Sequence, residues 1–534
     1  MKSSKRIVSL LLSVAMIAIL MAGCGGNKNA AAADERAATT QPVIAANDAN
    51  ISDDAVIRAQ GNELADTLKV VLKAEPSNLL PFANTEIYAA TVERCLFNTL
   101  VTRDTNQEFV GELAKSWEYV DDVTVRFHLN EGITFSDGTE LTAEDVAFSI
   151  MMNNESSKSV IYGVIADCKV VDHYTVDIIT TSANAALFSN LAIARTSIIS
   201  KAYYEKVGPD EYGRNPIGSG PMVIDEWVTG NSISLKVRDD YWAERPSYDN
   251  LVIKFVTESA NRSIELETDE VDILIDPEPN DLNRLAEEGY NVIANASYSI
   301  SQFKVNAANV PDENIRKALA YAVDYDALVD AVYADTAVTA KGLFPLIMLG
   351  YEENFDISYD PDLAKELVAS SGNPNPELEV IVSSDTELST IAETLQYYWR
   401  QAGITVNIHQ ADQASIRERA TVGDFDIYID NSNWSTGDPS RCTSIFNYAS
   451  GKGTFGLPEE VAVKCQEYWD AGLAAIDEKE RVKIYSEYQQ FINEQLVFFP
   501  LAHKKIVYVT NSKVDNFYAN PNGSPDLKNV VIYK

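Results

Sequence analysis

The stretch Leu113–Ile150 constrains the fold more than any other part of the chain, because its side-chain pattern changes along its length. Polar and apolar residues alternate over 124–129, which is the period-2 pattern of a half-buried strand. We expect 117–120 to pair with this strand as a short hairpin. A second strand-like run, 132–135, ends at Asp137-Gly138, a dipeptide suited to a tight turn. The stretch therefore predicts a small antiparallel sheet.

A helix is predicted to follow that sheet directly. Thr142 stands three residues before Asp145, the spacing of a capping box, and apolar residues then recur on one side as far as Ile150. Asp137 and Asp145 could also be interpreted as a catalytic carboxylate pair. The turn and the helix cap explain both residues better, so we assign them to the scaffold.

The same stretch carries a family resemblance. Its run L-A-x-S-W-E, followed by F-H-L-x-x-G-I-x-F-S-D-G-T-x-L-T-A-E-D-V-x-F-S, resembles the signature region of the family 5 extracellular solute-binding proteins. These are the peptide- and nickel-type substrate-binding lipoproteins of ABC importers. Two later blocks fit as well, N-P-I-G-S-G-P at 215–221 and I-R-K-A-L-A-Y-A-V-D at 315–324. The glycines of the first block do not have the spacing of a phosphate-binding loop.

The resemblance implies an α/β fold with two lobes, like the periplasmic binding proteins of class II (cluster C), and an extra subdomain in the first lobe. At 534 residues the length also suggests about three domains. We expect the following segments: 1–23 a lipoprotein signal peptide, 24–63 a flexible tether, 64–104, 206–312 and 498–534 the first lobe, 105–205 the extra subdomain, and 313–497 the second lobe. Helical structure is expected over 313–331, and the chain would cross between lobes near 303–312 and 497–502.

The N-terminus predicts the compartment. Lys2, Lys5 and Arg6 precede an apolar run of 16 residues, 7–22, which is short for a membrane span of ~20 residues. The ending L-M-A-G-C resembles a bacterial lipobox, in which Cys24 would carry the lipid. The alternative is an uncleaved anchor. The resemblance thus implies an extracytoplasmic protein that is lipid-anchored to the bacterial membrane.

Composition excludes several other classes of function. A formal charge of −36 argues against nucleic acid and against an anionic membrane surface as the main partner. The chain has four histidines without a nearby motif, and neither GxSxG nor HExxH occurs, so we expect no enzyme. No CxxC pair occurs, and direct metal ligation is not expected. Whether a disulfide joins two of Cys95, Cys168, Cys442 and Cys465 stays open.

In the resembling family the ligand-determining region corresponds to 424–439 here. Peptide-binding relatives carry an acid three residues after a tryptophan, which pairs with the free amine of the peptide, a charge-assisted contact. This chain has Trp434 and Asp438-Pro439 but two residues fewer between them, and Asn431 stands where an arginine often does. The usual amine anchor is therefore missing, and Asp438, Asp430 or Glu86 could replace it. The resemblance implies the ligand-binding candidates Glu86, Tyr88, Tyr298, Asn431, Trp434, Ser435, Thr436 and Asp438.

The function implied by the resemblance is capture of a peptide or peptide-like solute in a cleft between the lobes, which close by hinge motion. Delivery to the transmembrane subunits of an ABC permease would follow. Three alternatives remain: a receptor for a metal chelate such as nickel, a receptor for an oligosaccharide, and a ligand sensor without transport. No cofactor is expected, and the protein is expected to act as a monomer.

Overall fold

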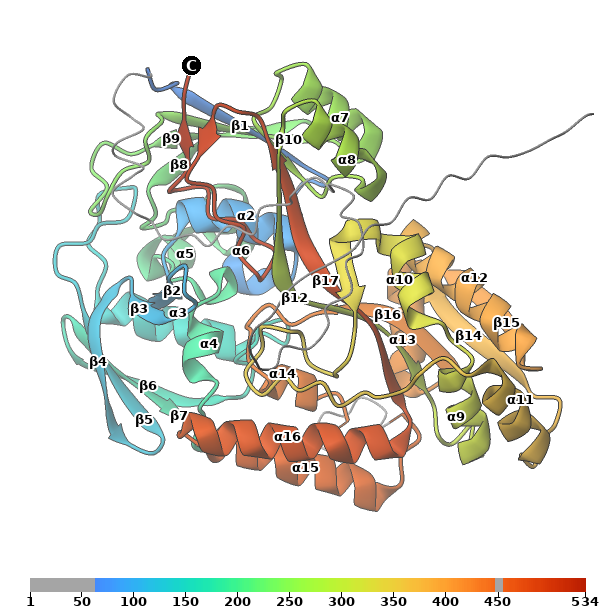
Figure 1. The fold of residues 1–534 in the computed structure, drawn as a ribbon. Coiled ribbons are helices and arrows are strands. Elements are labelled where there is room, and N and C mark those ends of the chain that lie inside the picture. Colours follow the sequence, from blue (N-terminus) through green and yellow to red (C-terminus); the bar gives the residue numbers. More distant parts are fainter. Residues whose placement is uncertain (1–62, 447–454) are drawn as a thin grey trace, which may run out of the picture. The chain divides into compact units, whose positions relative to one another are not determined.

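A computed structural model describes residues 63–446 and 455–534 of the chain (Figure 1). The predicted signal peptide and the predicted tether up to residue 62 lie outside the described residues. Within the described part, the largest sheet has eleven strands in the order β15-β14-β16-β12-β17-β11-β1-β10-β9-β8, with β13 paired to β17. The fold is mixed α/β, as predicted.

Two long antiparallel strands, β12 (Asn291–Val305) and β17 (Phe498–Thr510), join two regions of that sheet (Figure 1). The first half of β12 and the last residues of β17 lie beside the first lobe's strands, where β17 pairs with β11. The second half of β12 pairs with β16, from Ser299 to Val305. The register between β12 and β17 shifts between Ala296 and Ser299. The strands are therefore continuous across both lobes and irregular between them.

The first sheet region alternates its side chains between two cores. Val70 and Leu72 pack into one core, and Val71 between them packs into the other. This alternation is the period-2 geometry of a strand covered on both faces. The elements of the region are β1 (Thr67–Leu72), α2 (Ile87–Leu96), β8 (Met222–Val228), β9 (Ser232–Val237), β10 (Asn250–Phe255), α7 (Ser259–Glu267), β11 (Ile273–Ile275) and α8 (Leu282–Glu287).

Block 215–221 packs against the end of α2. The backbone N–H of Gly220 donates to the Leu96 carbonyl at 2.9 Å. A Cβ at Gly218 would lie only 1.9 Å from the same carbonyl oxygen, so this close approach requires glycine. The block therefore fixes the position of α2, which forms one wall of the site described below.

The signature stretch forms a separate four-stranded antiparallel sheet in the order β4-β5-β7-β6, covered by α3. The hairpin and the capping box are confirmed: the Asp145 carboxylate accepts from the Thr142 N–H at 3.0 Å, and the Thr142 hydroxyl accepts from the Glu144 N–H at 3.3 Å. The strand predicted over 132–135 is wrong, since only an isolated bridge between Thr134 and Glu140 forms there. The bounds are β4 (Ala114–Asp121), β5 (Thr124–Leu129), α3 (Ala143–Glu155), β6 (Ile165–Asp172) and β7 (Thr175–Thr180).

Short elements connect this sheet to the rest of the first lobe. They are β2 (Val101–Arg103), β3 (Phe109–Gly111), α4 (Leu187–Leu191), the 3₁₀ turn Ala194–Thr196, α5 (Lys201–Val207) and α6 (Pro209–Arg214). The C-terminal segment ends with the short pair β18 (Val514–Asp515) and β19 (Val531–Ile532). Its turn at 520–524 lies beside the site.

The second lobe is a sheet with helices on both faces. Val380 and Val382 face one core, whereas Ile381 faces the other. Its elements are α9 (Glu313–Tyr321), α10 (Tyr325–Tyr333), β13 (Ala337–Thr339), α11 (Pro361–Ser370), β14 (Glu377–Ser383), α12 (Thr386–Gln401), β15 (Thr405–Ala411), α13 (Gln413–Val422), β16 (Ile427–Asn433), α14 (Ser440–Thr443), α15 (Glu459–Ala474) and α16 (Glu478–Gln495). The helical structure predicted over 313–331 is confirmed but divided into α9 and α10, because the Asp324 carboxylate caps a new helix by accepting from the Ala327 N–H at 3.1 Å.

Candidate functional site

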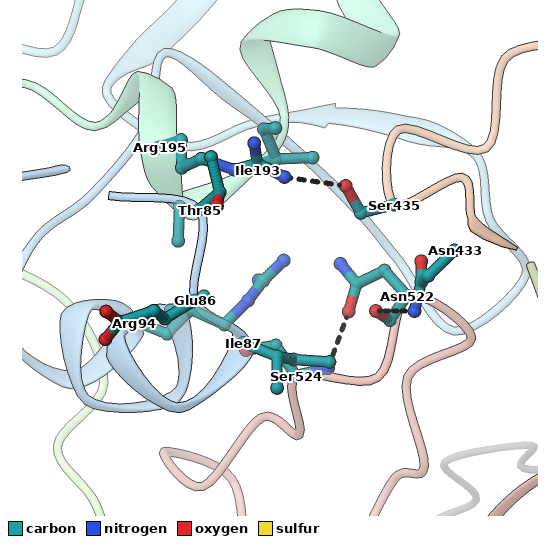
Figure 2. Close-up of a pocket in the computed structure, with 12 residues that line it drawn as sticks. Thr85, Glu86, Ile87, Arg94, Ile193, Arg195, Asn433, Ser435, Asn522 and Ser524 are labelled. Carbon is teal, nitrogen blue, oxygen red and sulfur yellow. Dashed lines mark hydrogen bonds between the residues drawn. The ribbon is translucent and has the colours of Figure 1, made fainter. Parts of the chain in front are cut away.

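A cavity of about 150 Å³ lies where the first lobe, the loop after β16 and the C-terminal segment meet (Figure 2). Helix α2 and the residues before it form one wall with Thr85, Glu86, Ile87, Ala90 and Arg94. The 3₁₀ turn contributes Ile193, Ala194 and Arg195, the second lobe Asn433 and Ser435, and the C-terminal turn Asn522 and Ser524. A molecule in this cavity would therefore contact both lobes at once.

Arg94 is the most unusual group in the cavity. Its side chain reaches toward the middle of the open space (Figure 2). The Nε atom is buried without a hydrogen-bond partner in the described part of the chain. Most buried polar atoms in proteins are hydrogen-bonded, and an unpaired charged group is costly. A guanidinium in this state has donors available for a ligand.

Arg195 lines the opposite wall and links the lobes. Its Nη2 donates to the Ser435 hydroxyl at 3.0 Å. Burial lowers the pKa of Arg195, and the nearby charge of Arg441 lowers it further. Both effects express the cost of holding a desolvated cation next to a second one. An anion placed here would relieve that cost.

Glu93, one residue before Arg94, does not supply the missing negative charge. It is fully buried, and burial raises its pKa to about 8. The Asn84 amide, which donates to Oε1 at 3.1 Å, and the charge of Arg195 both act in the opposite direction but do not outweigh burial. The carboxyl group is therefore mostly protonated at neutral pH.

A second cavity of about 10 Å³, room for about one water molecule, lies beside the first one and shares Arg94, Ile193, Ser435 and Asn522 with it. Arg103 lines it, and its guanidinium donates to the Gln107 carbonyl at 2.7 Å and the Ser189 hydroxyl at 3.0 Å.

Four of the eight predicted ligand-binding residues line one of the two cavities. Glu86 and Ser435 line the larger cavity, and Tyr298, Thr436 and again Ser435 line the smaller one. The Glu86 carboxylate also accepts from the Ser77 N–H at 2.9 Å. The Tyr298 hydroxyl donates to Oε1 of Gln107 at 3.2 Å.

The other four, Tyr88, Asn431, Trp434 and Asp438, line neither cavity. The Tyr88 hydroxyl donates to Asp276 at 3.4 Å, and burial raises its pKa. The Asn431 amide donates to Glu387 at 2.7 Å. Trp434 packs against the second lobe's core, although its indole N–H lacks a partner among the described residues.

Asp438 is the most important of these four, because the sequence suggested it as an amine anchor. It is 3% exposed, and its carboxylate accepts from Nη2 of Arg481 on α16 at 2.9 and 3.1 Å. The alternative anchor Asp430 is paired too, with Lys304 at 2.9 Å. Both carboxylates are thus neutralised by cations of the same chain.

Sequence reasoning missed Arg94, Arg195 and the two asparagines of the cavity. Arg94 lies inside a largely buried helix, between Glu93 and Cys95, which are both fully buried. A charged residue between buried positions was the only local hint. Asn522 comes from a segment 428 positions after Arg94, and no local pattern reveals that the two lie together.

Three further observations bear on the chemistry of the described residues 63–446 and 455–534. No group of three or more His, Cys, Asp or Glu side chains in them is arranged to hold a metal ion. No helix in them has both the length and the apolar character that crossing a membrane requires. The four cysteines Cys95, Cys168, Cys442 and Cys465 are free thiols in the structure.

Comparison with known proteins gives consistent results. The model of the bacterial extracellular solute-binding proteins, family 5 Middle, matches residues 108–454. The dipeptide-binding protein of Escherichia coli K12 is 26% identical over 475 residues, which cover 82% of this chain and 89% of the relative. Heme-binding protein A of Haemophilus influenzae is 26% identical over 447 residues, covering 77% of this chain and 82% of the relative.

Solved structures share the fold. The dipeptide-binding protein of Pseudoalteromonas sp. SM9913, solved in complex with Met-Leu, superposes with a TM-score of 0.76 at 22% identity. The superposition covers 88% of this chain and 100% of the other. This likeness supports the two-lobed architecture predicted from the sequence.

Proposed function

The chain belongs to the bacterial extracellular solute-binding proteins of family 5, and from that premise we propose that it captures a peptide or peptide-like small solute between its lobes and delivers it to an ABC permease. The observation that carries the proposal is the composition of the cavity: α2 and the 3₁₀ turn come from one lobe, and Asn433 and Ser435 from the other. A solute that contacts both lobes stabilises the arrangement in which they are close, which is the state that a permease would recognise.

The hinge follows from the two long strands. β12 and β17 cross between the lobes, and the ladder between them is interrupted between Ala296 and Ser299, where the pairing partners are Lys505 and Lys504. Fewer regular hydrogen bonds hold the backbone there, so small dihedral changes rotate one lobe against the other. This position lies outside the crossings expected from the sequence near 303–312 and 497–502, several residues before the first and just after the second.

Among the candidate residues, Glu86, Ser435, Tyr298 and Thr436 would contact the solute directly, since they line the cavities. Tyr88, Asn431, Trp434 and Asp438 would act indirectly by holding the surrounding loops. The other segments proposed from the sequence remain part of this proposal, but the lobe boundaries move from 312 and 497 to 296–299 and 504–505, since Phe303, Val305 and Phe499 pack into the second lobe's core.

The class of solute has an alternative with specific support. One relative that matches most of this chain is named a heme-binding protein, so the fold family is not restricted to peptides. A chelated metal such as nickel, or an oligosaccharide, would then take the place of the peptide. A further alternative is a ligand sensor without transport, in which the same closure of the two lobes on the solute would pass on a signal.

The test is to purify residues 25–534, release the bound small molecules by denaturation and identify them by mass spectrometry. Thermal-shift measurements with peptides, metal chelates and sugars then show which class stabilises the protein. We expect at least one solute to raise the melting temperature by several degrees. If no solute does so and the protein instead hydrolyses a chromogenic ester or glycoside, the receptor function is wrong.

We also propose that Cys24 carries a lipid and holds the mature protein, as a monomer, at the outer face of the bacterial membrane. The lipobox-like run L-M-A-G-C at residues 20–24 supports this proposal. In cell fractionation, Cys24→Ser should move the full-length protein from the membrane to the soluble fraction. Retention of this variant in the membrane would indicate an uncleaved span.

A further inference from the structure

We propose that the solute carries an acidic group, a carboxylate or another compact anion, and that Arg94, assisted by Arg195, binds it. This inference rests on the proposed function and specifies which end of the solute is anchored, and in which lobe. The anchor would be a cation of the first lobe, in place of an acid on the loop after β16.

The first line of evidence is the unpaired state of Arg94. No hydrogen bond or ion pair of its guanidinium is formed with any residue of 63–446 or 455–534, and Nε is buried. Arg94 is half-buried and its Nε is removed from solvent without a partner, which is unfavourable, whereas a carboxylate can accept two parallel hydrogen bonds from a guanidinium. The group is thus prepared for an anion from outside the chain.

The second line of evidence is the sign of the charge around the cavity. Its lining contains the cations Arg94 and Arg195 and the carboxylate Glu86, which the Ser77 N–H already engages. Arg103 adds a cation in the adjoining cavity. Glu93, behind the wall, is kept mostly neutral by burial. The protein as a whole has a formal charge of −36, so the lining of these cavities, in which cations outnumber carboxylates, differs in sign from the rest of the chain.

The third line of evidence is that two of the three acids which could anchor an amine, Asp438 and Asp430, are occupied. Asp438 is paired with Arg481 at 2.9 Å and Asp430 with Lys304 at 2.9 Å, and all four side chains are largely buried. Neither carboxylate lines a cavity. An ammonium group of the solute would therefore find no free partner at these two carboxylates. In the larger cavity it would meet Glu86 alone, whereas an acidic group would meet two arginines.

The remaining lining indicates the body of the solute. Ile87, Ala90 and Ile193 form an apolar surface beside Arg94, and Asn433 and Asn522 offer amide groups. The Asn433 amide already donates to the Asn522 carbonyl at 3.3 Å, which ties the second lobe to the C-terminal turn. A small molecule with one acidic end, a short apolar part and a few polar atoms fits this arrangement.

The experiment uses purified 25–534 and two matched pairs of probes, each an acid and a partner without the carboxylate. The first pair is L-alanyl-L-alanine and L-alanyl-L-alanine amide, and the second is D-galacturonate and D-galactose. The solute that mass spectrometry identifies in the test of function is the third probe. Binding is measured by titration calorimetry for the wild type, Arg94→Gln and Arg400→Gln. Arg400 is exposed in the last turn of α12 and serves as a matched control for the loss of one positive charge.

We expect the acid of a pair to bind about 10- to 100-fold more tightly than its partner without a carboxylate, which is the range for a hydrogen bond to a charged group. Arg94→Gln should remove this preference, and Arg400→Gln should keep it. Glu86→Gln should tighten binding of the acid, since it removes the one opposing charge in the lining. Thermal unfolding of each variant shows whether the fold is retained, and the preference within a pair is independent of small stability changes.

Three results would overturn the inference and leave the receptor function intact: a probe without a carboxylate that binds as well as its acid, an Arg94→Gln variant with undiminished preference, or an identified solute without an acidic group. If no probe and no cellular solute binds the wild type at all, the proposed function itself fails. The two failures are thus distinguishable.

Discussion

The signature stretch 113–150 and the loop 434–439 both carry family resemblance, but different contacts hold them in place. In the first, the helix cap is local: Thr142 and Asp145 are three residues apart, although the Asp145 carboxylate also accepts from the Lys201 N–H at 3.0 Å. In the second, the partners are distant, since Asp438 binds Arg481 and Ser435 binds Arg195, 240 residues away. The first stretch builds a scaffold from local rules, whereas the loop depends on the closure of the whole fold.

The largest loss of unfolding free energy should come from breaking the ion pair between Asp438 and Arg481. Asp438→Ala leaves the buried guanidinium of Arg481 without its anion, and removing one partner of a buried pair costs about 3–5 kcal/mol of unfolding free energy. Urea unfolding followed by circular dichroism measures the loss. Asp438→Leu combined with Arg481→Met removes both charges and should recover most of it.

A small loss of stability together with a loss of binding would show that the Asp438 carboxylate contacts the solute. A loss of less than about 1 kcal/mol, accompanied by loss of solute binding, would mean that Arg481 does not need this carboxylate in the unliganded protein. The loop would then resemble the amine-anchoring loop of its peptide-binding relatives.

The contrast between these regions explains what the sequence could predict. The hairpin at 117–129 and the capping box follow from alternation and spacing, which act over a few residues, and both are confirmed. Local patterns also misled: 132–135 has strand-forming residues, but it only bridges Thr134 to Glu140, because no neighbouring strand is available to it in the described fold. Local spacing cannot report the presence of a partner.

The site was predictable only in part for the same reason. The resemblance indicated a loop of which two residues, Ser435 and Thr436, line the cavities. It also suggested Asp438 as an anchor, but Arg481 occupies this carboxylate from 43 positions further along the chain. Arg94 escaped notice because its defining property is the absence of a partner, which only the three-dimensional arrangement reveals.

Substitution of Gly437, within the loop 434–439, should cause an intermediate loss of unfolding free energy. This residue has a φ of +67°, and a Cβ there would lie 2.5 Å from Cζ of Tyr298. Gly437→Ala should therefore cost about 1–3 kcal/mol, from the left-handed backbone and from displacement of the Tyr298 ring. Urea unfolding measures this cost, and solute titration shows whether the displaced ring also weakens binding.

Gly423→Ala is the matched control, because Gly423 has a φ of +75° while its Cβ would meet only the Asn306 amide at 3.4 Å. Its cost reports backbone strain with little steric conflict. Equal losses for the two variants would contradict the view that the loop is packed tightly on Tyr298. A larger loss at Gly437 would support it.

Substitution of Thr142, in the signature stretch, should cause the smallest loss of unfolding free energy. Thr142→Ala removes the hydroxyl that accepts from the Glu144 N–H at 3.3 Å, and loss of such a cap costs about 1 kcal/mol. Thr142→Ser keeps the hydroxyl and should lose much less. The capped helix packs on the four-stranded sheet, and none of its residues lines either cavity, so solute affinity should stay within about twofold of the wild type by calorimetry. A tenfold loss of affinity in Thr142→Ala would mean that the scaffold transmits its local stability to the cavity, and the separation between the two regions would then be wrong.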